Sequence, residues 1–138
     1  MIRIADKSDL RHLASMLKAM YVELMPEEAT TDINVYKKAM CEILENDLEV
    51  VYISKHGFFV VRDESEPMTP NKKRYQGTRV YIEPEHRKGF LLASFYKRLF
   101  SDFPDGEIVG LTESNSEHIN VLDKRHIEVA RIYILRRS

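Results

Sequence analysis

The chain has 138 residues, of which 43% are hydrophobic and 31% charged, as expected for one globular domain spanning residues 1–138. Its formal net charge of −1 gives no overall field that favours nucleic acid or a membrane surface. Because Cys41 is the single cysteine, an intramolecular disulfide and a cysteine-based zinc site are excluded. The sequence shows no signal-peptide pattern and no apolar run of bilayer length, so we expect a cytoplasmic protein.

The first third of the chain predicts one short strand and two amphipathic helices. Residues 2–4 alternate between apolar and charged side chains, which indicates the strand. Asp6 fits the N-cap of the first helix, with Asp9 at its third helical position. Thr31 or Asp32 fits the N-cap of the second helix. The second helix has apolar residues at helical spacing, namely Ile33, Tyr36, Met40, Ile43 and Leu44.

The middle of the chain predicts a β-hairpin followed by a long loop. The strands of the hairpin are residues 50–53 and 58–61, and residues 55–57 form the tight turn between them. Residues 62–76 contain prolines and many charges without any apolar period, which is typical of a loop. The basic run at residues 72–75 is either a solvated segment or a contact for nucleic acid or an acidic partner.

The second half predicts strands at residues 78–82, 107–112 and 127–135, the last of which is one strand or two. A short helix is expected at residues 114–125. Between the first two of these strands lies a helix whose apolar face consists of Leu91, Leu92, Phe95, Tyr96, Leu99 and Phe103. The element order is therefore β-α-α-β-β-β-α-β-α-β. It predicts an α/β or α+β fold, with a mixed central sheet and helices on both of its faces.

This order resembles that of the GNAT superfamily, the acyl-CoA-dependent N-acetyltransferases, over essentially the whole chain. Residues 2–10 resemble the first strand and helix start of that family. Residues 81–87, Tyr-Ile-Glu-Pro-Glu-His-Arg, resemble the exit of its fourth strand, apolar-x-Val-x-Pro-x-x-Arg. Asn115 together with residues 122–124 resembles the segment that follows its fifth strand. The chain is also similar to short, divergent GNAT-like proteins encoded by phages.

The resemblance implies that the fourth and fifth strands diverge and that the pantetheine arm of acetyl-CoA lies between them. It implies further that the N–H groups of the following loop bind the pyrophosphate, which is anion binding at a helix N-terminus. The strand residues whose main chain would contact the cofactor are Val80, Tyr81 and Ile82. The other implied cofactor contacts are Arg87, Lys88, Gly89, Phe90, Leu91, Leu92 and Asn115. Glu83 is the implied general base, with Glu113 as the other candidate.

The sequence departs from the family pattern at several of these positions. In the ungapped alignment Phe90 and Leu92 stand where the family has Gly or Ala, and Leu122 stands where many members have a tyrosine general acid. A gap of one residue would recover Gly89 as the loop glycine, but it would place Ser94 on the buried face of the helix. We adopt the ungapped alignment, in which the phosphate loop is reshaped.

Two functions therefore stay open. The first is transfer of acetyl from acetyl-CoA to a primary amine of a small molecule or protein, with an acceptor site built from the first two helices and residues 62–76. The second is a binding or assembly module with the GNAT fold but without catalysis, for example a virion-associated phage protein. The final strand allows a homodimer or a larger assembly. No pair of the five histidines has a helical metal-binding spacing with a carboxylate partner, so no metal site is predicted.

Overall fold

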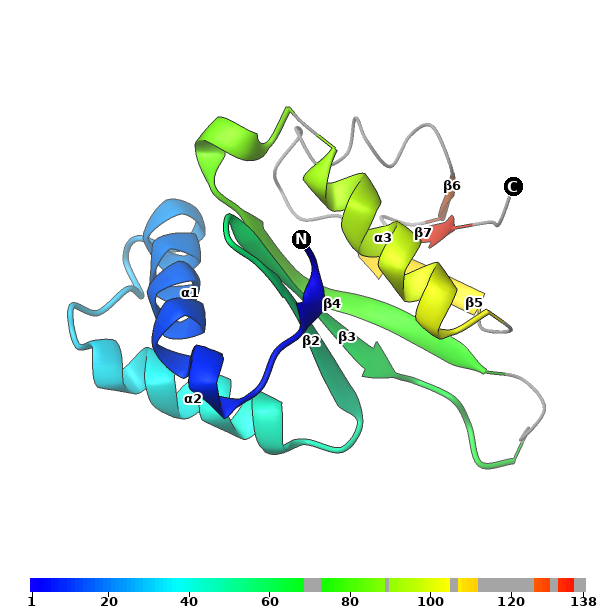
Figure 1. Cartoon of the computed structure of the whole chain (residues 1–138), viewed down its shortest axis with the longest axis horizontal. Helices are drawn as coiled ribbons and strands as arrows, with labels where there is room; N and C mark the ends of the chain where they lie inside the picture. Colours follow the sequence, from blue (N-terminus) through cyan, green and yellow to red (C-terminus); the bar gives the residue numbers. More distant parts are fainter. Residues whose placement is uncertain (69–72, 89, 105–106, 112–125, 130–131, 136–138) are drawn as a thin grey trace.

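The structure is a computed structural model that describes residues 1–68, 73–88, 90–104, 107–111, 126–129 and 132–135, the last three ranges as backbone only (Figure 1). Its strands are β1 (Arg3–Ile4), β2 (Glu49–Ser54), β3 (Gly57–Asp63), β4 (Arg74–Ile82), β5 (Glu107–Leu111), β6 (His126–Val129) and β7 (Ile132–Leu135). Its helices are α1 (Leu10–Leu24), α2 (Ile33–Glu45) and α3 (Leu91–Asp102), with short 3-10 helices η1 (Lys7–Asp9) and η2 (Pro84–His86).

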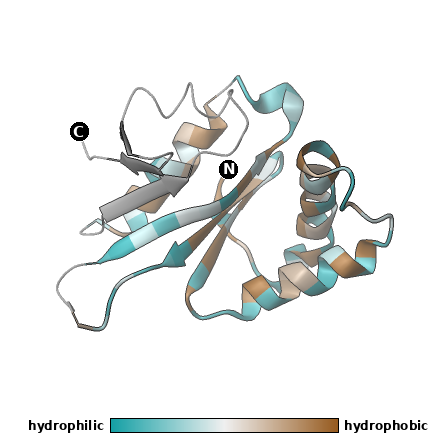
Figure 2. Ribbon diagram, turned by 180° about the vertical axis from the view of Figure 1, so that it is seen from behind, coloured by the Kyte–Doolittle hydropathy of each residue, from teal (hydrophilic) through white to brown (hydrophobic). Residues whose placement is uncertain are grey.

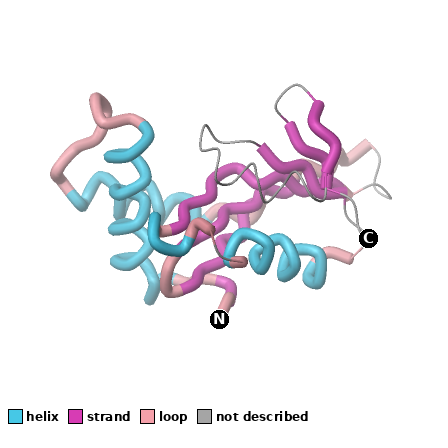
Figure 3. Tube along the Cα trace, turned by 90° about the horizontal axis from the view of Figure 1, so that it is seen from above, coloured by secondary structure: helices cyan, strands magenta, loops and turns pink. Residues whose placement is uncertain are grey.

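The described strands form one mixed sheet of seven strands in the order β1-β2-β3-β4-β5-β7-β6. All neighbouring strands pair antiparallel except β4 and β5, which pair parallel. The helices α1 and α2 lie against one face and α3 against the other, as the view from above shows (Figure 3). The predicted fold class is thus confirmed. No helix of the described ranges is long and apolar enough to cross a lipid bilayer.

The N-terminal segment is fixed by the predicted capping box. The side chain of Asp6 accepts a hydrogen bond from the N–H of Ser8, and the side chain of Asp9 accepts one from the N–H of Asp6. The guanidinium of Arg3 on β1 donates to both carboxylate oxygens of Asp9. Of the two candidate caps for α2, Asp32 is the one whose side chain accepts from the helix N-terminus.

Each face of the sheet carries its own apolar core, because successive side chains of a strand point to opposite faces. The strands β2 and β3 are accordingly hydrophobic over most of their length (Figure 2). On one face α3 buries Leu92, Phe95, Tyr96 and Leu99 against side chains of the strands, namely Tyr52, Phe59, Val61, Val80 and Ile82. The hydroxyl of Tyr52 donates to Asp102 over 2.7 Å and ties the end of α3 to β2. This packing fixes where α3 begins relative to the end of β4.

The loop predicted at residues 62–76 is wrong at both of its ends. β3 continues to Asp63 and β4 begins at Arg74, so that Arg62 pairs with Gln76 and Asp63 pairs with Tyr75. These positions carry charged side chains, so they show no hydrophobic period that would indicate a strand. The start of β4 is nevertheless held in the sheet by its pairing with β5 and by the contact of the Tyr75 ring with Phe103, 4.2 Å between centroids.

The C-terminal predictions are partly outside the described residues. Residues 126–129 and 132–135 form two antiparallel strands, β6 and β7, which is the second of the two alternatives for the final strand. The helix predicted at residues 114–125 lies outside the described residues.

Candidate functional site

The strands β4 and β5 run together for only part of their length. β4 pairs with β5 from Arg74 to Gly77, opposite Glu107 to Gly110, and no described residue of β5 pairs with β4 beyond that point. A β-bulge lies there, because Val60 on β3 faces Arg79 while Val61 faces Gly77, which leaves Thr78 as the extra residue. A bulge bends its strand and re-aims the residues that follow. β4 therefore bends after Gly77 and continues to Ile82, whereas the described part of β5 ends at Leu111, one residue beyond the last pair. The divergence that the resemblance implies stays a prediction.

Gly77 is the last residue of β4 that pairs with described β5, and it has a steric reason to be glycine. A Cβ at this position would lie 2.6 Å from Cε1 and 2.8 Å from Cζ of Phe59, a ring buried in the core beneath α3. The same Cβ would lie 3.5 Å from the hydroxyl of Tyr96 on α3. The close approach of strand and ring thus depends on a residue without a side chain.

Beyond Gly77, the edge of β4 that faces away from β3 presents main-chain groups. The N–H of Glu83 donates to the carbonyl of His56 over 2.8 Å, which fixes the direction of the groups at the end of the strand. Since these directions alternate along an antiparallel strand, Tyr81 bonds toward β3 while Val80 and Ile82 direct their main-chain groups the other way. The Ile82 carbonyl on that side accepts from Nε of Arg87 over 2.9 Å. The N–H groups of Val80 and Ile82 thus point where the pantetheine arm is expected.

The N-terminus of α3 lies one short turn beyond this edge. Its N-cap residue, Phe90, makes no side-chain capping bond, and the Phe90 side chain is 86% exposed. Leu92 is 2% exposed in the core, whereas Ser94 is exposed, which agrees with the ungapped alignment. Lys88 is exposed, and Gly89 lies outside the described residues. Uncapped first-turn N–H groups of this kind bind anions.

Arg87 takes a position that the sequence did not suggest. Its side chain is buried, and its terminal nitrogens donate to both carboxylate oxygens of Glu23 on α1. The guanidinium also lies 5.8 Å from the ring centroid of Tyr81, where burial raises the pKa of the phenol and the positive charge opposes that rise. Arg87 thus connects α1 to the end of β4. Its predicted role at a pyrophosphate stays a prediction.

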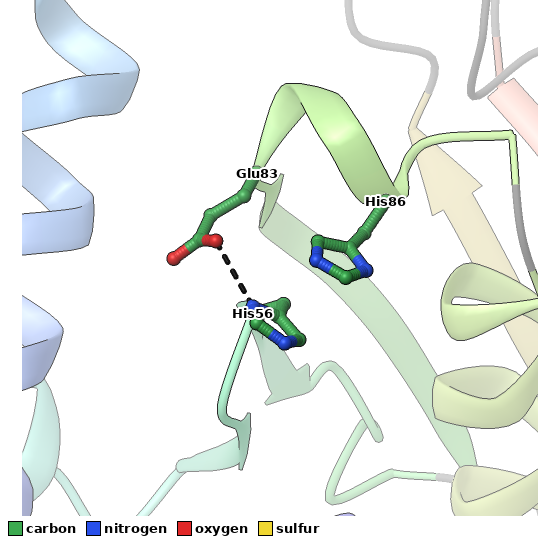
Figure 4. Close-up of side chains that lie close together, drawn as sticks. All are labelled: His56, Glu83 and His86. Carbon is green, nitrogen blue, oxygen red and sulfur yellow. Dashed lines mark hydrogen bonds and ion pairs between the residues drawn. The ribbon is translucent and has the colours of Figure 1, made fainter.

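Glu83, the predicted base, belongs to a cluster of three polar side chains (Figure 4). Oε2 of Glu83 lies 3.0 Å from Nδ1 of His56, and both side chains are 34% exposed. The ring of His86 stacks on that of His56 with 3.6 Å between centroids and 13° between planes. His56 occupies the two-residue turn between β2 and β3, and its pairing with the end of β4 brings it to Glu83.

A shallow pocket of about 480 Å³ flanks the end of β4 on the α1 side. Its lining residues are Ser15, Lys18, Ala19, Val22, Glu23, Tyr81 and Pro84. Of the segments expected to build an acceptor site, α1 therefore contributes most of this wall. The remaining candidates, Asn115 and Glu113, as well as Leu122, lie outside the described residues.

No model of a protein family and no curated protein sequence matches the chain. Solved structures do match. A ribosomal-protein-alanine N-acetyltransferase from Brucella melitensis biovar Abortus 2308 superposes with a TM-score of 0.73 at 15% identity, covering 100% of this chain and 99% of that one. A predicted acetyltransferase with acetyl-CoA from Clostridium acetobutylicum gives a TM-score of 0.64 at 16% identity, with coverages of 88% and 87%.

A third neighbour carries the family name itself. It is a GNAT family acetyltransferase from Streptococcus agalactiae 2603, with a TM-score of 0.65 at 15% identity, covering 100% of this chain and 96% of that one. This chain has the GNAT fold. Similarity at such low identity establishes the fold alone, so any activity has to be argued from the residues at the end of β4.

Proposed function

We propose that the protein is an acetyltransferase that moves an acetyl group from acetyl-CoA to a primary amine by direct attack in a ternary complex. The observation that carries the proposal is that β4 continues from Thr78 to Ile82 beyond its pairing with β5. It leaves the edge of β4, the uncapped start of α3 and the carboxylate of Glu83 at the same end of the sheet.

The residues at this end fit acetyl-CoA. The main-chain N–H groups of Val80 and Ile82 face away from β3 and would pair with the amides of the pantetheine arm. The first turn of α3, from Leu91, offers N–H groups to the pyrophosphate, and exposed Lys88 adds a positive charge beside them. The exposed side chain of Phe90 leaves that terminus open. Acetyl-CoA supplies the activated acyl group, and the chain supplies position and proton transfer.

Glu83 would accept the proton that the attacking amine loses. Its Oε2 is held by His56, which fixes the carboxylate and leaves Oε1 to receive the proton. The N–H groups on the edge of β4 would stabilise the negative charge that develops on the acetyl oxygen. The pocket beside α1 would hold the acceptor, and its lining includes the apolar side chains of Ala19 and Val22 together with the ring of Tyr81.

The test begins with isothermal titration of acetyl-CoA and CoA, for which we expect dissociation constants no weaker than the high-micromolar range. Acetyl transfer to a panel of primary amines then gives kcat/KM. We expect Glu83→Gln to lower turnover by about 10²–10⁴-fold with the affinity for acetyl-CoA unchanged. Glu85→Gln, an exposed carboxylate in η2, is the matched control and should keep full turnover. Absence of binding at millimolar acetyl-CoA would overturn the proposal.

A second candidate is a GNAT-fold binding or assembly module without catalysis, such as a virion-associated protein. One observation favours it: the guanidinium of Arg87 is committed to Glu23 rather than presented to the start of α3. Under this alternative neither CoA nor acetyl-CoA binds, and Glu83→Gln has no functional effect. The titration therefore separates the two functions.

A further inference from the structure

Three metal-binding side chains meet at the tip of the β2–β3 hairpin. Figure 4 shows Glu83 reaching toward His56 from the end of β4, while His86 lies beside the ring of His56. One ligand atom from each side chain, an imidazole nitrogen or a carboxylate oxygen, lies within 4.8 Å of the others. The sequence did not suggest this cluster, because His56 is separated from the other two residues along the chain.

This donor set suits a divalent first-row transition metal. Two imidazoles and one carboxylate form a common catalytic type of zinc site, which leaves a fourth position for water, whereas Mg²⁺ and Ca²⁺ favour oxygen ligands. Ligands at about 2.0–2.1 Å from a tetrahedral ion lie about 3.3 Å from one another. The separation of 3.0 Å between Nδ1 of His56 and Oε2 of Glu83 is already close to that value.

The backbone of the cluster is fixed, whereas its side chains have to rearrange to bind an ion. The N–H of Glu83 donates to the carbonyl of His56, and the N–H of His86 donates to the carbonyl of Glu83, each over 2.8 Å. The side chains of His56 and Glu83 are each 34% exposed, so an ion that arrives from solvent has to replace the hydrogen bond that holds Glu83 to His56. Stacked rings do not aim their nitrogens at a common point, and the ion therefore has to separate the rings of His56 and His86 when it binds.

We propose that His56, Glu83 and His86 bind one zinc ion or a similar divalent transition metal. Because Glu83 is also the proposed base, the ion would occupy the carboxylate that acetyl transfer uses and would inhibit turnover. This consequence rests on the proposed function, whereas the metal site itself does not.

The test is a calorimetric titration of zinc into the full chain carrying no affinity tag, with Cys41→Ser in all proteins to remove the single thiol. We expect one equivalent of zinc to bind with a micromolar dissociation constant. His86→Ala should weaken binding by more than about tenfold, since even the loss of an outer partner of a metal site costs that much. His12→Ala is the matched control, because His12 contacts the carbonyl of Lys55 in the same turn but lies outside the cluster.

Two further measurements make the outcome decisive. Zinc should shift the imidazole NMR signals of His56 and His86 while those of His12 stay in place. If His86→Ala does not fold, His86→Gln takes its place as the test variant, because its side chain has a similar length and lacks the imidazole ring. No zinc binding at millimolar concentration, or equal binding by the parent and the His86 variants, would overturn the metal site. Zinc binding by a chain that, free of zinc, does not bind acetyl-CoA at millimolar concentration would support the site and refute the proposed function, so the two failures are distinguishable.

Discussion

Arg87 has two alternative roles that an experiment can separate. In the structure it pairs with Glu23, whereas the family pattern places it at the pyrophosphate. The side chain is 7% exposed, donates from both terminal nitrogens to Glu23 and bonds from Nε to the Ile82 carbonyl over 2.9 Å. Hydrogen bonds to a charged partner contribute about 1.5–3 kcal/mol and a neutral one about 1 kcal/mol. The carboxylate of Glu23 is 35% exposed, so solvent screening places the ion pair at the lower end. We expect Arg87→Leu to lower the free energy of unfolding by about 2–3 kcal/mol.

The assay is urea unfolding followed by circular dichroism, with Lys88→Leu as the exposed neighbouring control, for which we expect a change within about 0.5 kcal/mol. A double-mutant cycle with Glu23→Gln should give a coupling energy of about 1–2 kcal/mol. A loss below about 1 kcal/mol for Arg87→Leu, together with a coupling energy near zero, would refute the reasoning. Loss of acetyl-CoA affinity at unchanged stability would instead place Arg87 at the pyrophosphate.

Three further predictions concern Gly77, Asp9 and Phe90. Gly77→Ala drives a Cβ into the buried ring of Phe59 and should lower the free energy of unfolding by about 1–3 kcal/mol, measured by urea unfolding; no loss would mean that the ring moves aside. The hydrogen bonds from Arg3 hold the pKa of Asp9 below its ordinary value of 3.8, so their stabilisation is present above that pH and is lost as the pH falls through the lower folded value. Arg3→Gln should therefore flatten the acid side of the stability–pH curve, and an unchanged slope would contradict this. Phe90 is the exposed N-cap residue of α3 and its side chain makes no capping bond, so Phe90→Gly should leave the stability unchanged and tighten acetyl-CoA binding, measured by titration. Weaker binding would show that the ring itself contacts the cofactor.

Features of the fold that depend on neighbouring residues were predictable from the sequence. The capping box of Asp6 and Asp9 closes within one helical turn, and the cap of α2 by Asp32 is equally local. A tight turn at residues 55–57 was predicted from the apolar strands on both sides, and Lys55 and His56 form it, whereas Gly57 is already the first residue of β3. In each case the residues that make the contact are close in sequence, so spacing alone contains the information.

Features that depend on strand register were not predictable in the same way. The polar start of β4 is a strand because β3 and β5 flank it, and nothing in the side chains of Arg74 or Gln76 indicates that. The contact between His56 and Glu83 requires knowing that the hairpin turn is level with the end of β4, and a shift by one residue would separate the two side chains. The signal that was available, a histidine in a turn and another beside a strand-end glutamate, becomes specific only once the register is known.

Two of the departures from the family pattern, Phe90 and Leu92, have different physical consequences. Both Phe90 and Leu92 suggested a crowded phosphate loop in the sequence, because a bulky side chain at either position could block the approach of the backbone to an anion. In the structure the Phe90 side chain projects into solvent, whereas Leu92 is part of the core beneath α3. A small residue at position 92 would leave a cavity that costs about 2–5 kcal/mol, so Leu92 is a structural requirement of this helix. Leu92 therefore anchors the first turn of α3 in the core, and the reshaped phosphate loop stays a prediction. The proposed acetyl transfer is compatible with Phe90 and Leu92, and the observation that argues against it is the ion pair between Arg87 and Glu23.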